Sequence, residues 1–332
     1  MRIAVDVMGG DNAPKEILAG ALAMAKERPD WEILLVGQED IMPADLPANV
    51  KKVFASLVMA MDESVENIRK KTDSSIWVAT KLVKEGLADA VVSAGSTGAQ
   101  IISASLLLGR TKGVDRPAIG IVYPTLQGGK ILLDAGANPE IKPPQFLQFG
   151  RMGSVFARGL LKIERPKVAL ISNGTEAGKG TANIVEAHKI LAASELNFIG
   201  NIEGRDIPFG EYDVAVCDGF VGNMILKVSE GFAKVLLSKL KEEFLRSLFT
   251  KIAAGIMKPG LKRIMKLMDD SEYGGAPLLG VKGISIVCHG KSDAKAIKNG
   301  IKAAAYYVET GFVEQIEESM QIEENLQNEE NL

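Results

Sequence analysis

One lysine stands inside a glycine-rich segment whose composition suits phosphate. Residues 174–181 (GTEAGKGT) join an expected strand to an expected helix, and Lys179 is their only cation. Such a connection offers backbone N–H donors and the positive end of a helix dipole, to which Lys179 adds an ammonium group. A nucleotide-binding P-loop needs four residues before its Gly-Lys pair, whereas three precede Gly178, and Gly180 replaces the magnesium-binding hydroxyl residue. The segment predicts a phosphate site; an ATPase loop and a solvated lysine are the alternatives.

Residues 95–98 (GSTG) form a second candidate anion site. They follow an expected strand and open an expected helix. Successive N–H groups in such a turn can bind an anion, and Ser96 and Thr97 add hydroxyl donors. Because Ser and Thr are also ordinary N-cap residues, this motif alone is a weak indication of an anion site and supports one only together with the other motifs.

Five expected strands end in polar loops that contain glycine. In an open α/β sheet the loops at the carboxyl ends of the strands line the ligand crevice, so we expect these five on one edge. Tight turns favour glycine as well, but five such loops together predict a binding site. The candidate substrate- and phosphate-binding residues are Asp6, Gly9, Gly10, Asp11, Gly95, Ser96, Thr97, Gly98, Asp134, Asn138, Gly174, Thr175, Glu176, Asp218 and Gly222.

The sequence offers no convincing covalent nucleophile and no metal-binding set. Its two cysteines and two histidines lie far apart, and two thiols make no disulfide framework, which is typical of a reducing cytoplasm. Cys288 and His289 are neighbours on an expected strand and point to opposite faces, so they cannot act as a thiol–imidazole pair. We therefore expect Cys217 and Cys288 to pack in the core. The remaining groups indicate direct transfer between two bound substrates. A phosphate dianion can attack a thioester unaided, so the protein has to position the substrates and stabilise charge.

Apolar runs alternate with helical patterns and predict one α/β domain over residues 1–313. Continuous aliphatic and β-branched runs are typical of strands buried on both faces, and their alternation with helices indicates a doubly wound sheet. The expected strands are 2–7, 32–36, 88–92, 118–122, 130–134, 167–172, 213–217 and 284–288. The expected helices are 15–27, 64–85, 98–108, 144–161, 181–193 and 293–309.

Charge and hydropathy limit the classes of partner. The formal net charge of -3 argues against nucleic-acid binding, which needs a large basic surface. No apolar run reaches the roughly 18 residues that a bilayer span requires, and the amino terminus enters a strand pattern without a signal-peptide core. Residues 314–332 are rich in Glu, Gln and Asn and lack basic residues, so we expect a disordered tail.

Residues 222–270 are almost wholly helical in pattern, which is more than a crossover needs. We expect one helix to end at Pro259 and another to begin at Gly260, and every charge in 247–268 is positive. An apolar stripe flanked by cations can lie in an anionic membrane interface, and packing against a dimer partner is the alternative. The predicted membrane-contact residues are Leu261, Ile264, Met265 and Met268.

Together these motifs resemble the phosphate:acyl-[acyl carrier protein] acyltransferases along nearly the whole chain. Asn12 departs from the histidine that the family often has, Ser96 from its usual asparagine, and residues 144–145 from a common Glu-His pair. These departures leave the backbone donors in place. The matching stretches are 3–11 (IAVDVMGGD), 93–99, 133–138 (LDAGAN), 174–176 with 179–180, 198–206 (FIGNIEGRD), 217–223 (CDGFVGN), 273–280 (YGGAPLLG), 289–290 and 292–294.

The resemblance implies a Rossmann-like three-layer α/β/α sandwich, related to phosphotransacetylases, in a homodimer without metal or organic cofactor. It implies fatty acyl transfer from acyl carrier protein to inorganic phosphate, giving acyl phosphate that a membrane glycerol-3-phosphate acyltransferase uses for phospholipid synthesis. Lys179 would neutralise phosphate, and Asn223 would hold phosphate or the thioester oxygen. The resemblance also favours a helical dimer interface and a membrane-touching hairpin tip, hence a cytoplasmic protein bound peripherally to the inner face of the cell membrane.

Two other functions stay open at this point. A phosphotransacetylase-like enzyme would use coenzyme A thioesters and need a nucleotide pocket, whereas a basic docking patch favours an acidic carrier protein. A non-catalytic membrane adaptor that recruits the carrier is the third reading, and an anion bound at Lys179 would argue against it.

Overall fold

The computed structural model describes residues 1–61, 63, 65–267 and 274–330. Its 11-stranded sheet has the order β3-β2-β1-β4-β11-β10-β5-β6-β9-β7-β8. The strands are β1 (Arg2–Asp6), β2 (Glu32–Gly37), β3 (Val50–Phe54), β4 (Ala90–Ser93), β5 (Ala118–Thr125), β6 (Gly128–Leu133), β7 (Val168–Ile171), β8 (Phe198–Ile202), β9 (Val214–Val216), β10 (Ala276–Leu279) and β11 (Ile284–Val287). The helices are α1 (Lys15–Glu27), α2 (Ser75–Lys84), α3 (Thr97–Leu107), α4 (Pro143–Leu161), α5 (Ala182–Ala192), α6 (Gly219–Leu245), α7 (Leu248–Leu267), α8 (Ala294–Glu309) and α9 (Phe312–Glu330).

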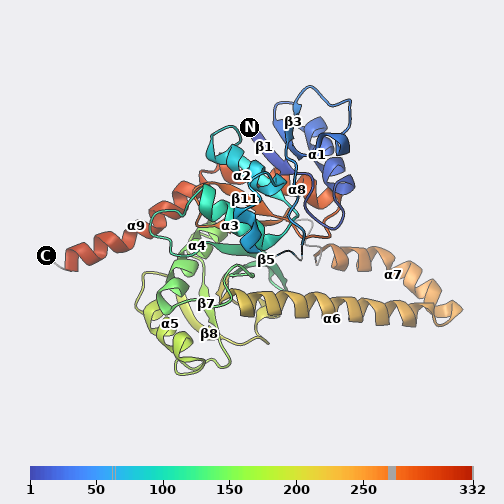
Figure 1. Cartoon of the computed structure of the whole chain (residues 1–332). Helices are drawn as coiled ribbons and strands as arrows, with labels where there is room; N and C mark the ends of the chain where they lie inside the picture. The colour runs from blue at the N-terminus through green and yellow to red at the C-terminus, as the bar shows by residue number, and fades with distance from the viewer. Residues whose placement is uncertain (62, 64, 268–273, 331–332) are drawn as a thin grey trace.

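Helices cover both faces of this sheet and make a three-layer α/β/α sandwich (Figure 1). Successive strand side chains point to opposite faces, so Ile3 and Val5 of β1 pack with α1 and α8, whereas Ala4 packs with α2. In the other half of the sheet α4 and α5 share the face of α1, and α6 lies on the face of α2 and α3. The predicted fold class is confirmed.

The sheet reverses direction in its middle. Strands β1 to β4 run parallel to β11, and β6 to β9 run parallel to one another, but β5 is antiparallel to both β6 and β10. Loops after β1 and β4 therefore lie on one edge, and loops after β6, β7 and β9 lie on the opposite edge. The prediction that all five share one edge is wrong. The two-residue turn between Thr125 and Gly128 is far too short for a parallel crossover and forces the reversal.

The first half of the sheet consists of β1 to β4 and β11, and its last strand comes late in the sequence. After the second half (β5 to β9) and the helices α6 and α7, the chain returns through β10 and β11, and β11 pairs with β4. Helix α8 then packs against α1, so segments nearly three hundred residues apart form one layer.

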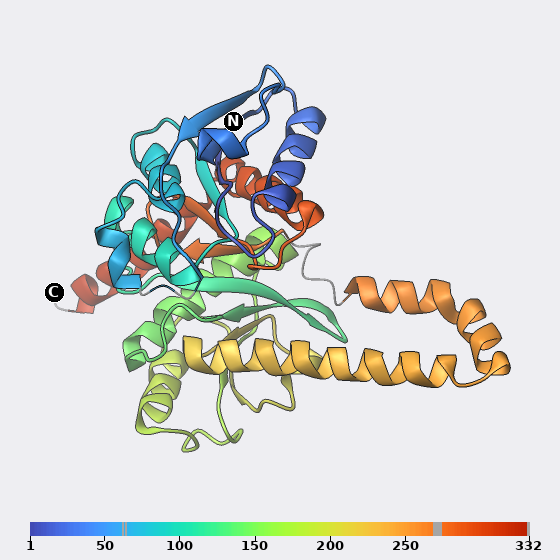
Figure 2. The ribbon, with the colours of Figure 1, turned by 45° about the vertical axis from the view of Figure 1, so that its right-hand side comes forward.

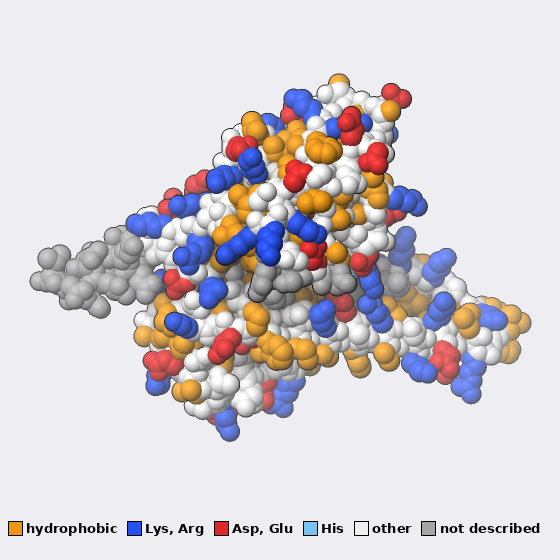
Figure 3. All heavy atoms as spheres, in the orientation of Figure 1, with side chains coloured by type: hydrophobic (Ala, Val, Ile, Leu, Met, Phe, Trp, Pro, Cys, Tyr) orange, Lys and Arg blue, Asp and Glu red, His pale blue; other side chains and the backbone are white. Residues whose placement is uncertain are grey.

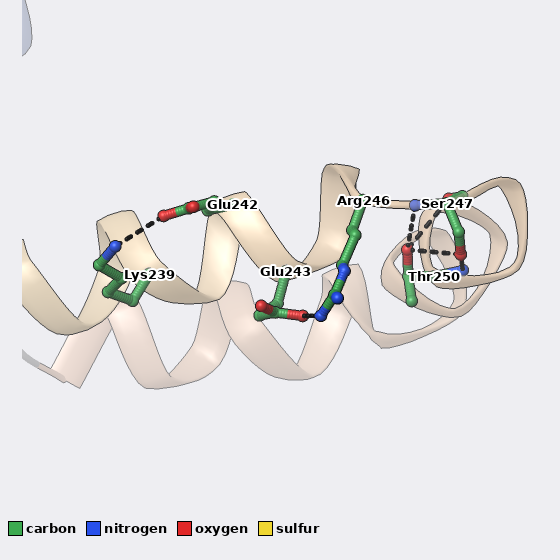
Figure 4. Close-up of polar contacts among 6 residues, drawn as sticks. All are labelled: Lys239, Glu242, Glu243, Arg246, Ser247 and Thr250. Carbon is green, nitrogen blue, oxygen red and sulfur yellow. Dashed lines mark hydrogen bonds and ion pairs between the residues drawn. The ribbon is translucent and has the colours of Figure 1, made fainter.

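Helices α6 and α7 form a hairpin that protrudes from the sandwich (Figures 1 and 2). At its tip the Thr250 N–H donates to Ser247 Oγ (3.2 Å) and the Ser247 N–H donates to Thr250 Oγ1 (3.0 Å), as Figure 4 shows. This reciprocal cap starts α7 directly after the turn. Pro259 lies inside α7, so the predicted break at residues 259–260 is wrong.

Among the described residues of α7, the strongly exposed apolar side chains lie near the hairpin tip. Leu261 is half-buried, the side chains of Ile264 and Met265 lie outside the described part, and Met268 lies outside the described residues. No helix within the described residues is long and apolar enough to cross a membrane. Strongly exposed side chains on α7 are Leu248, Phe249, Ile252, Ile256 and Met257.

The predicted disordered tail is also wrong in its first part. Helix α9 begins at Phe312 and packs against α4. Phe312, Ile316 and Met320, spaced four apart, are buried on the side facing the sandwich. The acidic composition hid this stripe, because the charged residues occupy the other positions of the helix.

Candidate functional site

Asp134 organises the loop after β6 on the second-half edge of the sheet. Its side chain is fully buried, and Oδ1 accepts N–H bonds from Ile119 (3.1 Å), Gly136 (3.0 Å) and Ala137 (2.9 Å). Oδ2 accepts from the backbone N–H (2.8 Å) and the side-chain Nδ2 (2.9 Å) of Asn138. Burial raises the pKa of the Asp134 carboxyl and outweighs these hydrogen bonds. Asp134 therefore shapes the loop and is not presented to a substrate.

The loop after β9 packs directly on the loop after β6. Gly219 donates its N–H to the Asn138 carbonyl (2.7 Å), and Asp218 caps α6 by accepting from the Val221 N–H (2.8 Å). A Cβ on Gly222 would lie 1.9 Å from the Asp134 carbonyl oxygen, so only glycine fits there. This close approach places the exposed Asn223 beside Gly136, on the first turns of α6.

The loop after β7 presents Lys179 on the same edge. Its backbone carbonyl accepts from Ser172 Oγ (3.1 Å), and its stem lies over Gly174, where a Cβ would come within 2.7 Å of Lys179 Cγ. Asn201 Nδ2 holds the loop from β8 by donating to the Glu176 carbonyl (3.0 Å). Thr175, Glu176 and Lys179 are exposed. Because β7 and β9 are neighbours, the loop that carries Lys179 lies next to the connection from β9 to α6, and Asn223 stands in the first turns of α6.

On the first-half edge, Asp6 has the role that Asp134 has on the other. It is buried, accepts N–H bonds from Met8 and Gly9 (both 3.1 Å), and accepts from Ser93 Oγ (2.7 Å) at the end of β4. Burial raises the pKa of the Asp6 carboxyl against these bonds. A Cβ on Gly9 would lie 2.7 Å from Gly95 Cα, so the two loops touch through glycine.

The remaining residues of this edge also make contacts within the fold. The Asp11 N–H donates to the Gly290 carbonyl (2.7 Å), and Asn12 Nδ2 donates to the carbonyls of Lys291 (3.0 Å) and Ser292 (3.2 Å). Gly10 has a φ of 111°, which favours glycine. Asn12 therefore joins the first loop to the loop after β11.

Residues 95–98 lead into α3 and do not form a separate anion-binding turn. Ser96 is the N-cap of α3 and accepts from the Ala99 N–H (3.4 Å), while Thr97 and Gly98 lie half-buried in the first turn. Further along α3, Ile101 and Ala104 share an apolar cluster with the loop after β6. This helix is the physical link between the two edges.

The predicted site residues thus fall into two sets joined by α3. The structure brings Lys179 and Asn223 to one edge. The second-half loops, a name used below for the loops after β6, β7 and β9 together with the first turns of the helices that follow them, hold Asp134, Asn138, Gly174, Thr175, Glu176, Lys179, Asp218, Gly222 and Asn223. The first-half loops, which are the loops after β1 and β4 together with the first turn of α3, hold Asp6, Gly9, Gly10, Asp11, Gly95, Ser96, Thr97 and Gly98.

Both thiols are buried, as the sequence predicts. Burial raises the pKa of Cys288 to about 12, and it raises that of Cys217 well above its usual value, with Asp134 and Asp218 adding to the effect. A thiol in such surroundings stays protonated and is a poor nucleophile. Within the described residues no three His, Cys, Asp or Glu side chains are grouped to hold a metal ion.

Two residues that position the loops, Ser93 and Asn201, are not among the predicted site residues. Ser93 joins β4 to Asp6, and Asn201 joins β8 to the Lys179 loop. Ser93 directly follows the predicted strand 88–92, which is the one available signal, whereas β8 is not among the predicted strands.

Comparison with known proteins decides the family. Residues 1–315 match the family described as "Fatty acid synthesis protein". A phosphate acyltransferase of Desulfitobacterium hafniense is 53% identical over 327 residues, covering 96% of this chain and 98% of the relative. One of Heliobacterium modesticaldum is 50% identical over 326 residues, covering 96% and 97%. The chain belongs to the phosphate acyltransferase family.

As a member of this family the chain is an acyltransferase. Among solved structures, a phosphotransacetylase from Streptococcus pyogenes matches with a TM-score of 0.61 at 17% identity, covering 93% of this chain and 94% of that one. The EutD phosphotransacetylase from Staphylococcus aureus matches with a TM-score of 0.60 at 15% identity and the same coverages. At these identities the likeness concerns the fold, and it agrees with the α/β sandwich of this chain.

Proposed function

We propose that this acyltransferase moves a fatty acyl group from the thioester of an acyl carrier protein to inorganic phosphate. The product is acyl phosphate for phospholipid synthesis, which a membrane glycerol-3-phosphate acyltransferase consumes. The observation that carries the proposal is the pair of exposed groups, Lys179 and Asn223, on adjacent loops of a chain from the phosphate acyltransferase family.

The proposed reaction is a direct attack. A phosphate oxygen forms a bond to the thioester carbonyl carbon, the carbonyl oxygen takes negative charge, and the C–S bond then breaks. The electron pair leaves with sulfur, and the carrier thiolate is protonated by solvent. Lys179 stabilises the phosphate charge, and the Asn223 amide donates to phosphate or to the developing oxyanion, which is the point where a fixed donor lowers the barrier most. The glycine-bearing loops around them supply further N–H donors.

The state of the thiols supports this route. Cys217 and Cys288 are buried and protonated, so an acyl-cysteine intermediate has no exposed nucleophile to form on. Asp6 and Asp134 are likewise occupied by hydrogen bonds within their loops.

One assay tests the function. The protein is mixed with acyl carrier thioester and inorganic phosphate, and free carrier thiol and acyl phosphate (trapped as hydroxamate) are measured in equal amounts. A parallel reaction with acyl coenzyme A tests the phosphotransacetylase-like alternative, which requires faster turnover with the coenzyme A thioester. Membership of an acyltransferase family speaks against the non-catalytic adaptor.

We also propose that the protein is a homodimer joined along α6. This helix exposes an apolar stripe, Phe220, Met224, Val228, Phe232 and Val235, at intervals of three and four residues. Figure 3 shows hydrophobic side chains along the border of α6. A stripe of this length is unusual on a monomer, and a second copy of the same helix covers it with matching chemistry.

The hairpin tip is proposed as the contact with an anionic membrane surface. Phe249 is 85% exposed, Ile256 77% and Leu248 73%, and the exposed cations Lys251 and Lys258 lie on the same helix. Apolar side chains beside cations suit the interface of an anionic bilayer. This contact would hold a cytoplasmic enzyme peripherally at the inner face of the cell membrane.

A further inference from the structure

A hollow beside the second-half loops is lined by three cations that have no role in the proposed reaction. Its volume is about 520 Å³, and it lies between the end of α3 and the start of α4. The lining includes Arg110, Arg116 and Lys142, which are all exposed, and Asp115 is the one carboxylate in it. Figure 3 shows Lys and Arg side chains over the α3 and α4 side of the molecule.

Hydrogen bonds within the lining and to α4 hold the residues around this hollow. Arg110 Nη1 donates to the Asp115 carbonyl (2.5 Å), and the Asp115 N–H donates to Gln148 Oε1 (3.0 Å). The Lys142 N–H donates to Gln145 Oε1 (2.8 Å). In the described part of the chain, neither Arg116 nor Lys142 is ion-paired with a carboxylate. The positive charges of Arg116 and Lys142 are therefore available to an anionic ligand, and the backbone around them is held by the hydrogen bonds just described.

The hollow is joined to the proposed reaction site through one side chain. Asn138 Nδ2 donates to the carbonyl of Pro117, which lines the hollow (2.7 Å), and to Asp134 (2.9 Å). The Asn138 carbonyl accepts from the N–H of Gly219, the first residue of α6. A ligand held in the hollow thus lies beside the loop that leads to Asn223.

We propose that this hollow docks the acidic acyl carrier protein at the point where its thioester arm is attached. The inference rests on the proposed function and names the docking surface for its substrate. A phosphopantetheine arm is joined to the carrier through a phosphodiester, so negative charge gathers where a flexible chain begins. Three cations around an open hollow complement that charge, and the arm can pass over the Asn138 loop toward Asn223. The hollow is not the binding site for the reacting phosphate, because that phosphate has to lie against the thioester carbonyl carbon.

Charge reversal tests this docking surface. Arg116→Glu and Lys142→Glu, singly and combined, are expected to raise the KM for acyl carrier thioester about tenfold or more, because like charges then meet at the interface. The loss is confined to the carrier: kinetics with acyl-pantetheine, which lacks the phosphodiester and the protein, keep their wild-type values, as does the KM for phosphate. Rising salt weakens carrier use by the wild type and has less effect on the variants.

Lys26→Glu is the matched control, since Lys26 is an exposed lysine on α1, a helix that contributes no residue to the lining of the hollow. Arg116→Gln, a milder change, should give a smaller effect in the same direction. Thermal unfolding of each variant shows whether the fold is retained.

Three results overturn the proposal: unchanged carrier kinetics in the reversed variants, an equal loss with acyl-pantetheine, or a raised KM for phosphate. Carrier binding is also measured directly by fluorescence anisotropy. If the wild type makes no acyl phosphate from any thioester, the proposed function fails, and anisotropy still decides whether Arg116 and Lys142 bind the carrier.

Discussion

At the scale of single residues, Lys179 is the side chain on which activity should depend most. We expect Lys179→Ala to lower kcat/KM about 10²- to 10³-fold, because one donor to a developing or bound anion is worth that much. The fold should survive, since the side chain is exposed on a loop held by Ser172 and Asn201. Steady-state kinetics with varied phosphate check this, with Lys189→Ala on the exposed face of α5 as control. Normal phosphate kinetics in Lys179→Ala would remove Lys179 from the mechanism.

Asp134 should matter for stability. Asp134→Ala leaves four backbone N–H groups, two of them buried and two partly buried, and the Asn138 amide without their acceptor, at about 1–3 kcal/mol for each buried group that stays unpaired. We expect a loss of at least about 3 kcal/mol in the free energy of unfolding, and a smaller loss for Asp134→Asn, which keeps one acceptor oxygen. Urea unfolding measures both, and the exposed Asp45→Ala is the control. Equal midpoints for Asp134→Ala and the control would contradict this role.

The thiols should stay inert over the working pH range. A raised pKa means that Cys288 stays protonated up to about pH 12 in the folded chain, whereas an unfolded thiol ionises near pH 8.5. Alkylation by iodoacetamide should therefore be slow in the folded protein from pH 7 to 9, and in urea it should speed up as pH rises. Mass spectrometry counts the labelled thiols. Trapping an acyl group on Cys217 or Cys288 would overturn the direct mechanism.

Much of the site could be predicted from the sequence at this scale, because glycine and small polar residues after apolar runs mark the loops. Gly222 shows the limit. Its position in a loop is evident from the pattern, but its 1.9 Å approach to the Asp134 carbonyl depends on which strands are neighbours. The same holds for Ser93, which reaches Asp6 only because β4 lies beside β1.

At the scale of elements, the hairpin tip should control membrane binding. Phe249→Glu with Ile252→Glu is expected to release the protein from anionic liposomes, because burying each apolar side chain gains roughly 1.5–3 kcal/mol at best. Activity with soluble carrier substrate should persist. Cosedimentation with vesicles measures binding, and Leu87→Glu, also exposed but in the turn after α2, is the control. Undiminished vesicle binding by the double variant would refute the tip contact.

The local hydropathy pattern predicts the buried strands and helices better than it predicts strands at the ends of the sheet or elements that contain proline. Helix α1 has the predicted bounds, and eight predicted strands are present within a few residues. The three remaining strands lack a continuous apolar run: β3 and β8 form the two ends of the sheet with partly exposed faces, and β10 contains Pro277. Pro259 indicates a helix break by its residue type, yet α7 continues past it, so local propensity failed there.

At the scale of the whole molecule, the α6 stripe should determine the oligomeric state. We expect Val228→Glu with Phe232→Glu to convert a dimer to a monomer, because two carboxylates would be buried from each copy without partners. Analytical ultracentrifugation over a range of concentrations measures this. The tip variant, Phe249→Glu with Ile252→Glu, is the control and should remain dimeric. A monomeric wild type, or a dimeric variant, would show that α6 is not the interface.

Strand direction is the whole-molecule property that the sequence pattern conceals most. Alternating strands and helices fit both a sheet with one carboxyl edge and this sheet with two. One clue was available: only seven residues separate the expected strands 118–122 and 130–134, whereas a parallel crossover needs a dozen or more. The reversal at β5 and β6 follows from that spacing and divides the candidate site into its two sets.

The return of the chain to its first half has a consequence for synthesis on the ribosome. Strand β4 lies between β1 and β11, and its partner Ile284 is 194 residues downstream of Ala90. An emerging chain can pair β1, β2 and β3 early, but one edge of β4 stays bare until residues 276–309 have left the exit tunnel. The second half, whose strands are contiguous in sequence, can close first. A chain cut short after α7 would therefore carry an open, aggregation-prone strand edge beside an otherwise finished half.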